Sequence, residues 1–206
     1  MDLMQLIQSQ LSDGLIDQLS NQIGGAPRQQ TEAATNGIVT ALVNAMARNA
    51  QRGNAEGIAN ALQRDHDGSL FDNMNDFLQG NIQPEQRRAA NGMGILNHLL
   101  GNKQGGIANM ISQMSGLDQN SAGSLMTMLA PIVMGALGKQ RRQNNLDADG
   151  IRSLLQDSAQ HQQQRATTNP AMGLISQFID QDGDGDIKDD LAGMGMKFLG
   201  NMFRGR

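Results

Sequence analysis

Cysteine, tryptophan and tyrosine are absent from the 206 residues, and the aromatic side chains are five phenylalanines. A chain without cysteine forms no disulfides, iron–sulfur clusters or thiolate zinc sites. Because the net charge is −4 and few rings are available to stack on bases, the composition indicates against nucleic-acid binding. The basic run of Lys139, Arg141 and Arg142 is predicted to be a solvated helix end.

Long hydrophobic runs are also missing. The longest nearly apolar stretch, LMTMLAPIVMGALG over 125–138, has 14 residues, whereas a membrane span needs about 20. We expect a buried core helix here and no membrane span, with Pro131 either kinking this helix or beginning a new one. The N-terminus lacks a basic region and a continuous apolar stretch, which argues against a Sec signal peptide. We therefore expect a cytoplasmic protein, and signal-independent export stays open.

What the sequence does contain is helical periodicity. Hydrophobic residues make up 38 % of the chain and include 14 methionines, so the expected core consists of Leu, Ile, Met and Ala. The first apolar stripe follows steps of three and four residues: Leu3, Leu6, Ile7, Leu11, Leu15, Leu19 and Ile23. Gly24 and Gly25 then favour a left-handed C-cap, and Thr31 with Glu32 is expected to open the next helix. No period-two pattern of β-branched residues is found, so the sequence predicts an all-α fold.

Two pairs of segments suggest an internal repeat. GIANALQRD (57–65) is similar to GIRSLLQD (150–157), and TALVNAMA (40–47) is similar to APIVMGAL (130–137), at nearly equal offsets. We predict a pseudo-repeated helical bundle with two similar halves over 1–157. A Gln/Thr-rich linker is expected at 158–169, followed by a short helix–loop–helix unit at 170–206.

Two stretches resemble a known family. They are LQRDHDGSLFDNMNDFL (62–78) and NGMGILNHLLGNKQGGIANMISQMSGLDQNSAGSLMTMLAPIVMGALG (91–138), with HDGS, GILNHLLG and LAPIVMG as the specific segments. Over about 1–157 the chain is similar to the bacterial family catalogued as domain of unknown function 937, which includes the YidB-like proteins. This resemblance implies an α-helical bacterial protein with no established activity and brings no catalytic residues. The aspartate-rich tail resembles an appendage of some members.

The clearest chemical motif is DQDGDGDIKDDL, residues 180–191. It follows the first half of a calcium loop, in which side chains at positions 1, 3 and 5 converge and Gly185 at position 6 allows the sharp turn. The predicted metal ligands are Asp180, Asp182, Asp184, Asp186, Asp189 and Asp190. Because all of them offer hard oxygen atoms, the expected ion is Ca²⁺, with Mg²⁺ possible.

The second half of this loop departs from the calcium-loop pattern. Leu191 stands at position 12, where the bidentate glutamate is expected, so either Asp189 or Asp190 would have to close the shell. Without a cation, the clustered carboxylates would repel one another by about 1 kcal/mol per pair in water and about 4 kcal/mol at an effective dielectric near 20. The alternative is an acidic turn whose aspartates favour the start of the next helix.

DHDGS (65–69) is a second candidate for chemistry. Asp65, His66 and Asp67 could form a metal or proton-transfer site. The plainer interpretation is an Asp67-Gly68 turn with Ser69 and Asp72 as a helix capping pair. His98 is expected to be a partly buried, hydrogen-bonded residue of a helix, and residues 145–155 are expected to start another helix.

Taken together, the residues predict a non-catalytic protein with a calcium-binding loop that acts as a structural or interaction module. The alternative is a self-associating helical scaffold without functional metal binding, formed through Met-rich and Ala-rich helix faces; light scattering at several concentrations would test it. A protein partner or self-association is expected, and no small-molecule substrate is identifiable. An enzyme that uses His66 with Asp65 or Asp67 is a third hypothesis.

Overall fold

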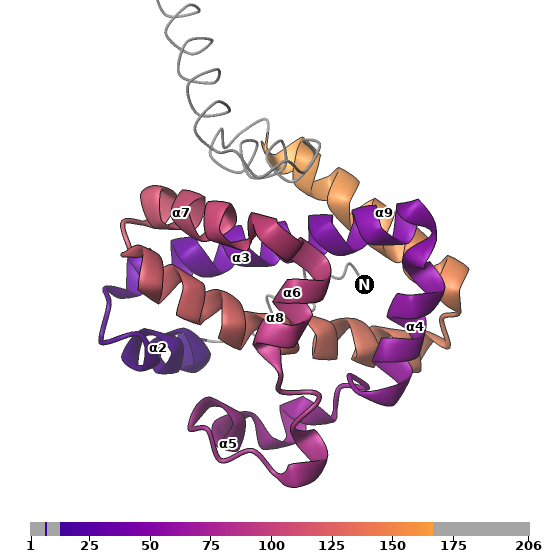
Figure 1. Cartoon of the computed structure of the whole chain (residues 1–206), viewed down its shortest axis with the longest axis horizontal. Coiled ribbons are helices and arrows are strands. Elements are labelled where there is room, and N and C mark those ends of the chain that lie inside the picture. Colours follow the sequence, from indigo (N-terminus) through magenta and orange to yellow (C-terminus); the bar gives the residue numbers. More distant parts are fainter. Residues whose placement is uncertain (1–6, 8–12, 167–206) are drawn as a thin grey trace, which may run out of the picture.

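The computed structural model describes residue 7 and residues 13–166, and this part of the chain is all-α without any strand (Figure 1). The predicted fold class is confirmed. The predicted metal ligands and the helix–loop–helix unit at 170–206 lie outside the described residues.

A tight turn joins α2 (Asp13–Gln22) to α3 (Arg28–Asn49). Gly24 and Gly25 have φ of +89° and +75°, which confirms the left-handed turn expected after the first described helix. Pro27 precedes the first turn of α3, so the predicted start of this helix at Thr31 is wrong by three residues. The physical reason is that proline lacks an N–H and has a fixed φ, which suits it to a helix start.

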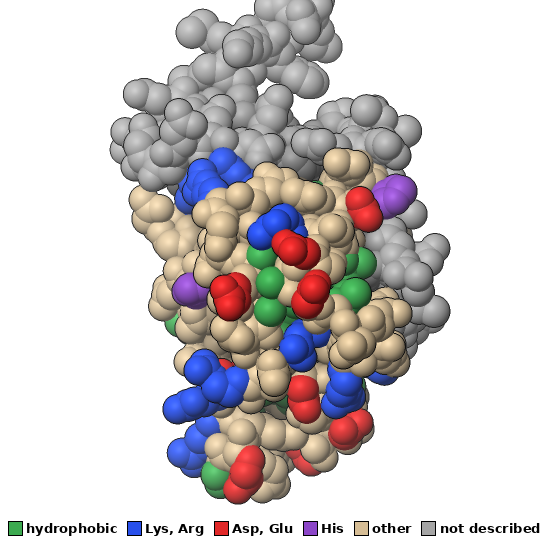
Figure 2. Space-filling model, turned by 90° about the vertical axis from the view of Figure 1, so that its right-hand side faces the viewer, with side chains coloured by type: hydrophobic (Ala, Val, Ile, Leu, Met, Phe, Trp, Pro, Cys, Tyr) green, Lys and Arg blue, Asp and Glu red, His purple; other side chains and the backbone are tan. Residues whose placement is uncertain are grey.

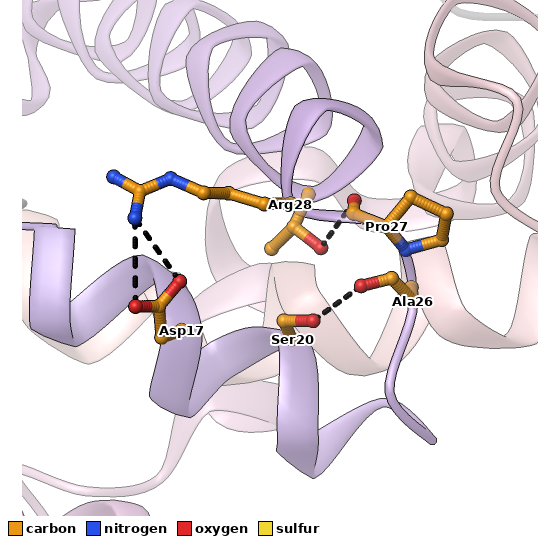
Figure 3. A network of polar contacts seen from close by, with 6 residues as sticks. Asp17, Ser20, Ala26, Pro27 and Arg28 are labelled. Carbon is orange, nitrogen blue, oxygen red and sulfur yellow. Dashed lines mark hydrogen bonds and ion pairs between the residues drawn. The ribbon is translucent and has the colours of Figure 1, made fainter.

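Polar contacts hold this junction together (Figure 3). The Arg28 guanidinium donates to the Asp17 carboxylate, with a nitrogen–oxygen distance of 3.2 Å. The Ser20 hydroxyl donates to the Ala26 carbonyl. Since Asp17 and Ser20 belong to α2, these contacts tie that helix to the start of α3.

The chain changes direction between α3 and α4 (Ala55–Arg64) through the π-type turn η1 (Ala50–Asn54). Gly53 interrupts the helical backbone there with φ of +95°, a conformation that residues with a side chain rarely adopt. Short elements follow: η2 (Ser69–Asn73), α5 (Met74–Leu78) and η3 (Pro84–Gln86). They lead to α6 (Gly92–Leu100), η4 (Gly101–Lys103) and α7 (Gln104–Ser115).

The central element is α8 (Gln119–Asn144), which contacts α3, α4, α6 and α7. Its apolar stretch is buried on nearly all sides, as predicted for 125–138. The helix runs through Pro131 without ending, so a new helix beginning at this proline is excluded. Within the described chain, α8 alone has the length and apolar composition to cross a membrane, but 72 % of its most apolar window is buried in the protein. A core helix meets the same criteria.

Pro131 lies at a close crossing between α8 and α6. Proline has no N–H, so it cannot donate to the Thr127 carbonyl four residues earlier in the helix. Gly92, the first residue of α6, lies against this carbonyl, because a Cβ placed on Gly92 would be only 1.8 Å from the Thr127 oxygen. Only a residue without a side chain allows the two backbones to approach so closely.

A second close crossing lies about three turns further along α8. A Cβ on Gly138 would be 1.6 Å from the His66 carbonyl oxygen and 3.2 Å from the Asp67 Cα. The turn that follows α4 therefore packs with its backbone directly on α8. Gly68, with φ of +97°, completes this contact, since its own Cβ would meet the Lys139 Cβ at 3.0 Å.

The described chain ends with α9 (Ala148–Ala166), whose first turn is capped by the Asp147 side chain accepting from the Gly150 N–H at 2.8 Å. The helix start predicted for residues 145–155 is confirmed. The helix continues over residues 158–166 of the segment predicted as a linker. Of the suggested repeat segments, those in α3 and α8 belong to contacting helices, as do those in α4 and α9. The equivalence of the two halves stays a prediction.

We predict that Gly138→Ala lowers the free energy of unfolding by about 3 kcal/mol, because backbone atoms of the 66–67 turn would have to move away from α8. Gly123→Ala is the matched control in the same helix, since its Cβ would meet nothing within 4 Å. It should be neutral or stabilising by up to about 1 kcal/mol, as expected for glycine replaced by alanine in a helix. Urea unfolding measures both, and equal effects would contradict the close crossing.

Candidate functional site

A cleft of about 480 Å³ lies between α4 and α6, with α8 at its base. The residues that line it come from both helices, from the turn after α4 and from the segment before α6. They are Gly57, Ile58, Ala61, Arg64, Asp65, His66, Arg88, Asn91, Gly94, Ile95, His98, Leu99 and Met134. Its volume is within the usual range for small-molecule sites.

The floor of the cleft is apolar. Ile58, Ile95 and Met134 are buried, and Ala61 and Leu99 pack against the same core. The helical spacing of Ile58 and Ala61 on α4, and of Ile95 and Leu99 on α6, directs each pair to one face of its helix. The floor therefore presents methyl-bearing side chains to a ligand in the cleft.

The rim carries two arginines and one aspartate. The Arg64 guanidinium lies against Asp65, with Nε donating to Oδ2 at 2.9 Å and Nη2 at 2.8 Å from the same oxygen. Arg88 lies further away, with Nη1 at 3.9 Å from Asp65 Oδ1, which is beyond hydrogen-bond distance. Its side chain is 77 % exposed, whereas that of Asp65 is 14 % exposed. The rim thus holds one more cation than anion.

His66 is buried at the inner end of the cleft and is 8 % exposed. Burial lowers its pKa below the ordinary value of 6.5, and the nearby Arg64 charge acts in the same direction, while Asp65 and Asp67 oppose the shift. The structure gives the His66 ring no hydrogen bond to a carboxylate of the described residues. Asp65 and His66 do line the same cleft, as a proton-transfer site would require, but Asp67 is not part of its lining.

Asp67 instead shapes the turn that follows α4. Its Oδ1 accepts from the Ser69 N–H at 2.9 Å, and Oδ2 lies 3.4 Å from Arg142 Nη1. The hydrogen bonds from Ser69 lower the pKa of Asp67 below 3.8, and the charge of Arg142 acts in the same direction with a smaller effect. The Asp67-Gly68 turn is confirmed. The predicted Ser69–Asp72 capping pair is wrong, because the acceptor at the start of η2 is Asp67, two residues before Ser69.

His98 is exposed, so the prediction of a partly buried histidine is wrong. Its Nε2 lies 3.5 Å from Asn54 Nδ2, at the long limit of a hydrogen bond. His98 lies in the same helix as Leu96 and Leu99, as the periodicity predicted. The buried side of that helix, however, is formed by Gly92, Ile95, Leu96 and Leu100, and His98 is not on it. His98 therefore faces the opening of the cleft.

The basic run at the end of α8 was predicted to be a solvated helix end, but its side chains contact other parts of the protein. Arg141 donates to the Gln63 side chain at 3.0 Å, and Lys139 Nζ lies 5.8 Å from the centre of the Phe71 ring. With the Arg142–Asp67 pair, these contacts hold the end of α8 to α4 and to the turn after it. On the face where α4 and α9 lie, acidic and basic side chains are mixed and hydrophobic atoms are exposed in small areas (Figure 2).

A second groove of about 560 Å³ lies among α6, α7 and the first half of α8, and no charged side chain lines it. Met93 is at its edge and is 52 % exposed, the one exposed large hydrophobic side chain of the described chain. The predicted self-association through Met-rich faces stays a prediction. Among the described residues, no three His, Asp or Glu side chains gather as a metal site would need.

The sequence interpretation singled out Asp65 and His66 but missed their partners across the cleft, Arg88 and Asn91. A signal was present: Ile58, Ala61 and Asp65 on one segment follow helical steps, as do Asn91, Ile95 and His98 on another. Nothing in that spacing shows that the two faces meet. Asn91 also caps α6, because its Oδ1 accepts from the Gly94 N–H at 3.0 Å.

Comparisons with known proteins identify a family but no characterised relative. A family model described as a bacterial protein of unknown function (DUF937) matches residues 5–140. A search of curated proteins and a search of solved structures found no match. The matched residues include both helices that form the cleft, the turn after α4 and most of α8.

We predict that acid destabilises the protein through His66. Because folding lowers the pKa of His66, the unfolded chain binds the proton more readily, so the free energy of unfolding falls as the pH drops below 6.5. Urea unfolding between about pH 7.5 and about pH 5 should show this loss, and His66→Gln should reduce it. His161→Gln, an exposed position on α9, is the control and should keep the wild-type dependence. An unchanged dependence in His66→Gln would refute the assignment.

Proposed function

Because the chain belongs to the DUF937 family of bacterial proteins of unknown function, we propose that its helical body is a non-catalytic binding module that works through the cleft between α4 and α6. The observation that carries this proposal is the cleft itself, with its apolar floor and polar rim. Concave sites of this size with a few convergent polar groups are the usual places for ligand binding.

The polar groups of the cleft suit binding better than catalysis. A general base needs a group that orients it and a pKa matched to its task. Asp65 is held by Arg64, and Asp67 is held by the Ser69 N–H and Arg142. Both carboxylates that could orient His66 are therefore engaged in ion pairs or in the turn. This supports a role for DHDGS in positioning one wall of the cleft.

Methyl NMR on the full chain tests the binding proposal. A set of small fragments should shift the methyl signals of Ile58, Ile95, Leu99 and Met134, which line the floor. Ile151 on α9 is buried and not part of the lining, so its signal serves as the control and should not move. A complete set of fragments that leaves the four floor methyls unchanged would contradict the binding module.

We further propose that the aspartate loop at 180–191 binds Ca²⁺, a proposal that depends on the sequence alone. Asp180, Asp182 and Asp184 have the spacing of the first three ligands, and Gly185 has the position of the turn glycine. The carbonyl of Asp186 would join them. Asp189 or Asp190 would then close the shell in place of the residue at position 12, which is Leu191.

Calorimetric titration of the full chain with Ca²⁺ tests the loop. The parent should show saturable binding, and Asp182→Ala should weaken it at least about tenfold, since a central ligand is lost. Asp157→Ala removes an exposed carboxylate of α9 outside the loop and should leave the titration unchanged. Repeating the titration with Mg²⁺ present distinguishes the two ions. No heat at millimolar Ca²⁺ in the parent would end the metal proposal.

A further inference from the structure

We propose that the cleft between α4 and α6 binds small amphipathic molecules whose head group is an oxyanion, with the head beside Arg88 and the apolar body on the floor. This inference rests on the proposed binding function and adds the chemical class of the ligand. Three features of the cleft carry it: the charge of the rim, the hydrogen-bonding character of the polar groups and the apolar floor.

The rim charge favours an anion. Two guanidinium groups meet a single carboxylate, and Arg64 is the one that hydrogen-bonds to it. Arg88, at 3.9 Å from Asp65, keeps its N–H donors directed to solvent or to a ligand. The local excess of positive charge is opposite in sign to the net charge of −4 of the chain. Nothing in the overall composition pointed to this reversal.

The polar groups around the cleft are mainly donors. Asn91 already uses its Oδ1 to accept from Gly94, so its NH₂ group is what it offers to a ligand. Arg64 and Arg88 have donors only. Arg64 donates to one oxygen of Asp65, Oδ2, so Oδ1 is the carboxylate acceptor that the rim still offers. A ligand head that accepts several hydrogen bonds matches the donors of Arg64, Arg88 and Asn91, whereas an ammonium head would add positive charge to a rim that already holds one more cation than anion.

The floor favours an apolar body attached to that head. Ile58, Ile95 and Met134 form its buried part, and Ala61 and Leu99, which are only partly buried, add the apolar surface that a ligand can remove from water. Methionine adapts its shape, so Met134 can accommodate chains of different outline. An inorganic anion would leave this floor uncovered. An alkyl carboxylate uses both parts of the cleft.

A carboxylate and a phosphate monoester share this head-group chemistry. The rim has one excess cation, so a single negative charge is balanced there and a second would remain uncompensated. Octanoate and octyl phosphate are therefore separate arms of the test, and octanol is the neutral arm. We expect octanoate to bind at least as tightly as octyl phosphate.

The experiment follows the methyl signals of Ile58, Ile95 and Met134 in the full chain during titration with each octyl compound. Octanoate should shift these signals to saturation. Its affinity should fall as ionic strength rises, because the head group is held by charge at an exposed rim. Octanol should bind at least about tenfold more weakly, as expected from the loss of hydrogen bonds to a charged group.

Two substitutions locate the site. Arg88→Gln should weaken octanoate binding by about tenfold and leave octanol unchanged. Arg87→Gln is the matched control, since it removes the same charge from the neighbouring position, which is exposed and not part of the lining. Ala61→Met fills the cleft from the α4 side and should weaken both compounds.

The outcomes separate this inference from the binding module. Equal binding of octanoate and octanol, or equal effects of Arg87→Gln and Arg88→Gln, overturns the oxyanion inference while the binding module stands. Tighter binding of octyl phosphate that is lost in Arg88→Gln supports the oxyanion chemistry and identifies a phosphate head. Absence of binding by all three compounds overturns the inference, and the fragment experiment alone then decides the binding module.

Discussion

The arrangement of the described chain depends on two places where another segment meets α8 backbone to backbone. At one, Gly92 lies on the Thr127 carbonyl, which Pro131 leaves without its helical donor. At the other, Gly138 lies under the His66 carbonyl. A side chain at either glycine would occupy the space of the facing backbone, so the protein depends on glycine at both crossings.

These crossings also determine the cleft. The first one places the start of α6 against α8, and the second one places the end of α4 and its turn against the same helix. Met134 lies on α8 between them and forms part of the floor. Because both walls are held by α8, the cleft does not require a ligand to assemble it, which reduces the ordering cost of binding. The contacts of Arg141 and Arg142 with Gln63 and Asp67 reinforce one wall.

The segment HDGS shows how composition can be interpreted in two ways. His66 and Asp67 are residue types that often serve in proton transfer or metal binding, yet most of the interactions of this segment are structural. Asp67 forms the turn, Gly68 allows the left-handed backbone and the His66 carbonyl packs on Gly138. Asp65 and the His66 ring remain at the cleft. A binding role for the body and a metal-binding role for the aspartate loop are independent of one another and can be separated by experiment.

The sequence by itself determined the helical fold, the glycine turn at 24–25, the Asp67-Gly68 turn, the helix start within 145–155 and the burial of 125–138, because these depend on periodicity and on local backbone preferences. It did not determine the start of α3 at Arg28, the acceptor at the start of η2 or the exposure of His98. Only the tertiary structure decided that α4 and α6 face each other, bringing Asp65 and His66 together with Arg88 and Asn91. The physical reason is that helical spacing defines which residues share a face, whereas the neighbour of that face depends on packing between residues far apart in the chain.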